Sequence, residues 1–125
     1  MTSKLTVQTP DGNFDAYVAM PTKLPAPVVV VIQEIFGVNA VMRDITDKSE
    51  AEWKQAFGYY QAFNVDKGVE DIAATLTAAR KIDGANGKAG VVGFCLGGLL
   101  TFLSATRTDG DAFAVYYGGG MNNYV

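Results

Sequence analysis

The chain has 125 residues and a net charge of −3 with interspersed acids and bases, so we expect one domain, residues 1–125, and no nucleic-acid partner. No segment approaches the roughly 18 consecutive apolar residues of a membrane span, and no apolar signal region opens the chain, which predicts a cytoplasmic protein without a membrane partner. The single cysteine excludes an internal disulfide and a cysteine-cluster metal site, and no cofactor or metal is expected.

The first 32 residues predict two kinds of strand. Residues 5–9 alternate apolar and polar side chains, residues 10–13 (PDGN) supply turn chemistry, and residues 14–20 follow, which predicts a half-exposed β-hairpin. A loop with three prolines then leads to residues 28–32, a continuous β-branched run (VVVVI). Such a run is typical of a strand that is buried on both faces, as in a parallel sheet covered by helices.

The middle of the chain predicts three helices. Asn39 is a candidate cap for the first, which is short, and Ser49 and Glu52 have the capping-box spacing at the start of the second. Asn64 begins the third helix, and Gly84 and Gly87 end it. The apolar residues of this third helix recur at spacings of four, three, four and three, the clearest helical signal in the chain: Val65, Val69, Ile72, Leu76 and Ala79.

The last part of the chain predicts strand, helix and strand. Residues 88–94 form a second strand of the buried type, residues 95–98 turn into a helix that continues through Leu103, and residues 112–117 form a third buried-type strand. Strands that alternate with helices predict the α/β class, with a mostly parallel sheet, an N-terminal antiparallel hairpin and flanking helices.

We expect the chemistry of the chain at Cys95, within GFCLGG (residues 93–98). This segment follows a buried strand, opens a helix and has the nucleophile-elbow pattern with cysteine in the place of serine. Side chains at Gly93 and Gly97 would clash with the tight turn that points the sulfur out at the C-terminal edge of the sheet. The helix N-terminus favours a thiolate there, and the amide of Leu96 would face a developing oxyanion.

Two other interpretations of this segment remain. In the first, Cys95 is a small buried hydrophobic residue instead of a nucleophile, and the glycines only let the helix pack closely on the strand. A phosphate loop is the second, but no GK[ST] follows and the residues FCL form a poor phosphate cradle. The strand before the segment and the helix after it favour the nucleophile elbow.

A second feature is QEIFG (residues 33–37), directly after the first buried strand. In this topology the loop lies beside the elbow and can supply the second oxyanion amide. Taken alone, Glu34 is either a charge partner of Cys95 or a solvated carboxylate at a strand end, and the second role is the more common.

Four segments together resemble the dienelactone hydrolase family, α/β-hydrolases that open unsaturated lactones and whose relatives cleave other esters. They are VVVIQEIFGVNAVM (29–42), DKGVEDIAATLTAAR (66–80), GVVGFCLGGLL (90–100) and YYGG (116–119), and the pairing of QEIFG with GFCLGG is highly specific to the family. The resemblance implies that Cys95 is the nucleophile and that Glu34 pairs with it and helps manage its protonation. It also implies that the amides of Ile35 and Leu96 are the oxyanion-hole donors.

The chain departs from the family pattern in two places. Family members have an aspartate and a histidine that complete a triad beyond the third buried strand, whereas this chain ends at Val125 and contains no histidine. Between Ile45 and Thr46, family members have a further helix, a buried strand and a loop with a substrate-binding arginine. In the family that strand lies between the hairpin and the strand at 28–32. Its absence leaves residues 28–32 as an apolar strand edge, and the absence of the family's C-terminal strands leaves residues 112–117 as another, so we expect the folded chain to self-associate.

These features predict an ester or lactone hydrolase that uses a cysteine nucleophile and an oxyanion hole on a small ester or lactone substrate. Because the triad base is absent, we expect acylation of Cys95 with poor turnover. The alternative is a non-catalytic α/β module for self-association or ligand binding. The labelling rate of the Cys95 thiol separates the two, since only an exposed elbow reacts readily.

Overall fold

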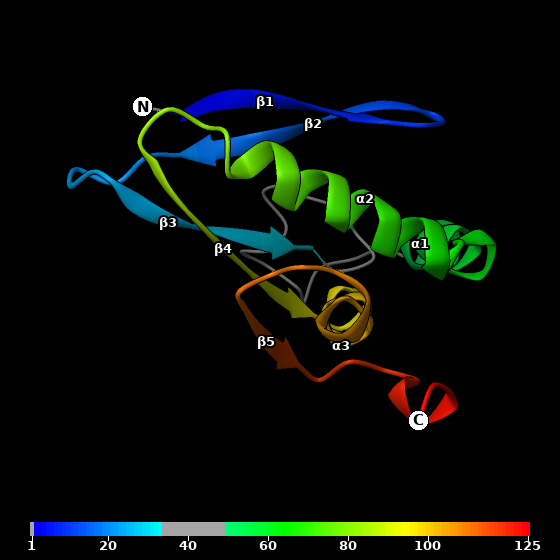
Figure 1. Cartoon of the computed structure of the whole chain (residues 1–125). Helices are drawn as coiled ribbons and strands as arrows, with labels where there is room; N and C mark the ends of the chain where they lie inside the picture. Colours follow the sequence, from blue (N-terminus) through cyan, green and yellow to red (C-terminus); the bar gives the residue numbers. More distant parts are fainter. Residues whose placement is uncertain (1, 34–49) are drawn as a thin grey trace.

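The computed structural model describes residues 2–33 and 50–125, and strands and helices follow one another there in the predicted order (Figure 1). The elements are β1 (Thr2–Thr9), β2 (Gly12–Ala19), β3 (Ala26–Ile32), α1 (Glu50–Ala62), α2 (Val65–Ala79), β4 (Ala85–Phe94), α3 (Leu96–Arg107), β5 (Ala112–Tyr116) and the short 3-10 helix η2 (Met121–Asn123). The predicted α/β class is therefore confirmed. The helix expected near Asn39 and the cap at Ser49 lie outside the described residues.

The strands form two separate sheets in the described part of the chain. β1 and β2 pair antiparallel from Thr2 opposite Ala19 to Thr9 opposite Gly12, so Pro10 and Asp11 form a two-residue loop and the hairpin is confirmed. β3, β4 and β5 form a parallel sheet in that order, with β4 in the centre. Figure 1 shows the hairpin lying apart from β3, and α2 contacts both β1 and β3.

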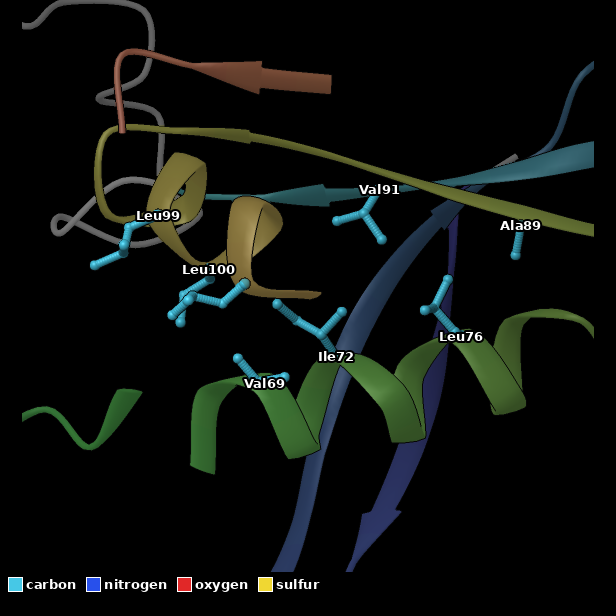
Figure 2. Packing of buried hydrophobic residues seen from close by; sticks show 8 residues of the cluster. Val69, Ile72, Leu76, Ala89, Val91, Leu99 and Leu100 are labelled. Carbon is cyan, nitrogen blue, oxygen red and sulfur yellow. The ribbon is translucent and has the colours of Figure 1, made fainter. Parts of the chain in front are cut away.

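Helix α2 supplies the centre of the core. Its first turn is capped by Asn64, whose side-chain oxygen accepts from the Lys67 N–H at 3.1 Å, as the sequence predicts. The helix ends at Ala79, earlier than the predicted glycine stop, and a turn carries the chain to Gly84. Figure 2 shows its apolar stripe facing α3 and β4, and the cluster consists of Val69, Ile72, Leu76, Ala89, Val91, Leu99, Leu100 and Leu103.

Among residues 2–33 and 50–125, helices cover one face of the parallel sheet only, which corrects the expectation that its strands are buried on both faces. Val28, Val30 and Ile32 of β3 pack against the core cluster, while Val29 and Val31 between them are 62% and 57% exposed. In β5 only Phe113 is half-buried, and the other four residues are exposed. The β-branched run correctly predicts a strand, but whether a second layer covers its other face depends on parts of the chain far away in sequence.

The order of the sheet leaves β3 and β5 as its two edges within the described residues. This confirms that these strands are edges, and self-association through them stays a prediction. None of the helices described for residues 2–33 and 50–125 is long and apolar enough to cross a membrane.

A polar network fixes the start of β5 beside β4. Lys88 Nζ and the Ala89 N–H donate to the Asp111 carboxylate at 2.7 and 2.9 Å, and Arg80 donates to Asp111 and to Asp109. Lys88 first, then the Ala89 amide, hold the pKa of Asp111 well below its usual range. Because the Asp111 N–H also donates to the Ala89 carbonyl at 2.8 Å, the register that brings the far end of β5 to the candidate site is set here.

Candidate functional site

Cys95 lies at the turn between β4 and α3, where the nucleophile-elbow pattern places it. It is half-buried and has a backbone φ of 55° and ψ of −116°. A non-glycine residue rarely adopts a positive φ, and residues held in such sparsely populated regions cost on the order of 1–3 kcal/mol each. The structure therefore holds Cys95 in a strained conformation, which a cysteine that served only as core filling would not require.

The buried positions around Cys95 require glycine, because the turn leaves no room there for side chains. A Cβ on Gly93 would overlap the carbonyl oxygen of Gly97 and Oγ1 of Thr101. A Cβ on Gly97 would lie 2.5 Å from the Ile32 carbonyl oxygen and 2.8 Å from that of Gln33, at the end of β3. The steric reason that the sequence predicts for Gly93 and Gly97 is confirmed.

Three further residues hold the turn, and sequence reasoning did not single them out. The Cys95 N–H donates to the Tyr116 carbonyl at 3.2 Å, and Thr101 Oγ1 donates to the Gly97 carbonyl at 2.8 Å. A Cβ on Gly98 would overlap the same Tyr116 oxygen. The double glycine is a signal for the close approach at Gly98, whereas Tyr116 is 21 residues beyond Cys95 and only the fold reveals its contact.

An aromatic group adjoins the elbow. Phe94 stacks on Tyr116 with ring centroids 5.0 Å apart, and Tyr117 lies 6.1 Å from Phe94 in a tilted arrangement. Tyr116 and Tyr117 are 50% and 67% exposed, so both rings form part of the surface next to Phe94, the residue that precedes Cys95. Such exposed rings can pack against a flat apolar group.

Leu96 is the first residue of α3, and a first-turn amide has no carbonyl partner within its own helix. Its N–H is thus placed next to the sulfur-bearing residue at the positive end of the helix dipole. Glu34 and Ile35, the other two predicted site residues, lie outside the described residues. The structure thus brings together Cys95, Leu96, Gly93 and Gly97.

The strain at Cys95 has a measurable consequence for stability. We expect the Cys95→Gly variant to be more stable than Cys95→Ala, with a free energy of unfolding about 1 kcal/mol higher. Glycine adopts the positive φ without strain, and the relief of strain exceeds the stability lost because glycine gives the unfolded chain more conformational entropy. Both free energies come from urea unfolding. Ala105→Gly, on the exposed side of α3, is the control and is expected to lose about 1 kcal/mol. A Cys95→Gly variant less stable than Cys95→Ala would contradict a strained turn.

Comparison with known families gives a match over most of the chain. The model of the dienelactone hydrolase family matches residues 14–52 and 46–124. A carboxymethylenebutenolidase from Pseudomonas putida is 37% identical over an alignment that covers 100% of this chain and 64% of the relative. A carboxymethylenebutenolidase 1 from Cupriavidus pinatubonensis is 31% identical, with 91% of this chain and 60% of the relative covered.

The matches also locate a discontinuity inside the chain. The Pseudomonas putida alignment runs over 152 positions against 125 residues here, which leaves at least 27 positions of the relative without a counterpart. The two parts of the family match meet at residues 46–52, next to the point where the sequence predicts missing segments. The chain spans just under two thirds of the length of this relative.

Solved structures show the same fold. A dienelactone hydrolase-type protein from Klebsiella pneumoniae superposes with a TM-score of 0.66 at 20% identity, covering 86% of this chain and 55% of that one. A dienelactone hydrolase-like promiscuous phosphotriesterase from metagenomic libraries gives a TM-score of 0.61 at 18% identity, covering 86% and 54%. At these identities the likeness supports the architecture alone.

Proposed function

The chain belongs to the dienelactone hydrolase family, and we propose that it attacks small esters or lactones with Cys95 as the nucleophile. The observation that carries this proposal is the strained backbone of Cys95 at the turn between β4 and α3. Residues held in such strained conformations cluster at active sites and ligand-binding sites. The names of the relatives, which are carboxymethylenebutenolidases, favour an unsaturated lactone as the substrate class.

The proposed step is acyl transfer to sulfur. The Cys95 thiolate attacks the carbonyl carbon, a C–S bond forms, and the carbonyl electron pair moves onto oxygen. The Leu96 amide donates to that oxyanion, and the Ile35 amide is its second donor in the family pattern. Collapse re-forms the carbonyl and breaks the C–O bond to the leaving group, which takes up the proton that the thiol released. Glu34 stands in this proposal as the group that manages that proton.

The test is acylation by an activated ester. Mixing the 125-residue protein with a slight excess of p-nitrophenyl acetate is expected to add one acetyl group, which peptide mass analysis locates on Cys95. Cys95→Ala provides the matched control and is expected to gain none. An acetyl group found on lysines while Cys95 stays free would refute the assignment of the nucleophile.

A further inference from the structure

The hairpin and the parallel sheet enclose a groove that the proposed reaction does not use. The groove has a volume of about 640 Å³, and its described walls are residues 14–20, in and just after β2, and residues 26–32 of β3. Its floor comes from α1–α2 and α3, including Phe63, Ile72, Thr75 and Leu100. We call this cavity the β2–β3 groove. Figure 1 shows the two strands that flank it.

Both walls of the β2–β3 groove are strand edges without a partner strand in the described part of the chain. β2 pairs only with β1, and β3 pairs only with β4. Along a strand, backbone N–H and C=O groups point alternately to its two sides, so each wall offers a row of donors and acceptors. A purely apolar ligand in this groove would bury those groups without hydrogen bonds, which is costly. The unpaired backbone groups of the walls therefore favour an occupant that carries regularly spaced amide donors and acceptors of its own.

We propose that the β2–β3 groove binds an extended peptide segment, supplied by another polypeptide, as a strand between β2 and β3. The seven residues of β3, at about 3.3 Å each, give a groove about 23 Å long, which suits about seven residues of the occupant. We expect the side chains of the occupant that face the floor to be apolar, because the floor residues Ile72 and Leu100 are almost completely buried. This inference does not depend on the hydrolytic function proposed above.

The occupant must be a free segment and not the edge of a folded sheet. An edge strand of a second folded copy has only one unpaired side, so it pairs with one wall of the groove at most. A segment outside any sheet pairs with both walls. The alignment adds an independent reason, since at least 27 positions of the Pseudomonas putida relative have no counterpart within this chain of 125 residues. The matched parts meet at residues 46–52, soon after β3.

Two of the described residues that line the groove are acidic: Asp15 of β2, which forms an ion pair with Lys4, and Asp71 of α2. We expect Asp71 to give the groove a charge preference. Asp71 lies on the floor, which is otherwise largely apolar apart from Thr75, and is half-buried. Burial first, then the negative charge of Asp11, raise the pKa of its carboxyl. Lys67, the nearest cation on α2, forms an ion pair with Asp11. A lysine or arginine on the floor-facing side of the occupant would stabilise the Asp71 carboxylate, so we expect a basic residue among its alternating apolar ones.

The experiment uses a fluorescein-labelled peptide, Val-Thr-Val-Thr-Lys-Thr-Val, and fluorescence anisotropy with the full 125-residue protein. Its valines and lysine share one face and its threonines the other. We expect saturable binding that raises the melting temperature of the protein. A peptide with the same side chains but N-methyl groups on alternate amides loses one edge of donors and is expected to bind at least about tenfold more weakly.

Two protein variants test the charge preference. Asp71→Asn is expected to weaken binding of the lysine peptide about threefold, whereas Glu70→Gln, which removes the same charge from an exposed position of α2, is expected to leave it unchanged. Equal binding of the methylated and unmethylated peptides would overturn the proposal in favour of an apolar ligand site. A dimer that neither binds the peptide nor dissociates with it would overturn it in favour of a second copy in the groove.

Discussion

Gly93→Ala is expected to destabilise the protein by about 3 kcal/mol or more, because the new methyl group overlaps atoms of α3. The two atoms in its way, the Gly97 carbonyl oxygen and Thr101 Oγ1, are joined by a buried hydrogen bond of 2.8 Å. Neither atom is the far end of a flexible side chain, so the whole first turn of α3 must move away from β4. That movement also separates Leu99 and Leu100 from the core cluster.

Urea unfolding followed by circular dichroism measures this loss. Gly119→Ala is the matched control, since a Cβ there meets nothing within 4 Å, and its unfolding free energy is expected to stay within about 0.5 kcal/mol of the parent. If Gly93→Ala unfolds at the same urea concentration as Gly119→Ala, the close approach of α3 to β4 at the elbow is wrong.

An excess of p-nitrophenyl acetate is expected to release one equivalent of p-nitrophenolate per protein in a burst, followed by a slow phase. The chain has no histidine, and a positioned general base typically contributes 10²–10⁴-fold to such a step, so hydrolysis of the acyl-cysteine is expected to be slower by about that factor. Added imidazole supplies a base from solution. The slow phase is therefore expected to accelerate in proportion to imidazole concentration.

Cys95→Ala with the same imidazole concentrations gives the background reaction of the ester and is expected to show no burst. Sustained turnover without imidazole that disappears in Cys95→Ala would contradict the prediction, because another group of the chain would then act as the base. A burst that persists in Cys95→Ala would contradict the nucleophile itself.

The sequence predicts local structure well where a pattern has one physical solution. The four-three spacing of Val65, Val69, Ile72 and Leu76 permits only a helix with one buried face, and α2 is that helix. The segment GFCLGG likewise predicts the turn at Cys95, because only glycines at positions 93 and 97 permit so close an approach of strand and helix.

What the sequence does not predict depends on contacts between distant segments. The run VVVVI looks the same whether one face or both faces of β3 are covered, and the structure covers one. α1 has aromatic residues at helical spacing, yet Trp53 and Phe57 are 45% and 55% exposed. Among the described residues of this helix only Ala56 is deeply buried, so the aromatic spacing does not predict which residues reach the core. The β4–β5 register determines the position of the Tyr116 carbonyl, which accepts from the Cys95 N–H, and no local sequence pattern encodes that pairing.

The three glycines of the elbow divide the site into positions that tolerate variation and positions that do not. Gly93 faces α3, Gly97 faces the end of β3, and Gly98 faces the end of β5, so the first turn of the helix rests on backbone from every strand of the parallel sheet. Phe94 and Leu96, by contrast, are only half-buried. A library that seeks new substrate preference at this site should therefore randomise positions 94 and 96 and leave the glycines unchanged.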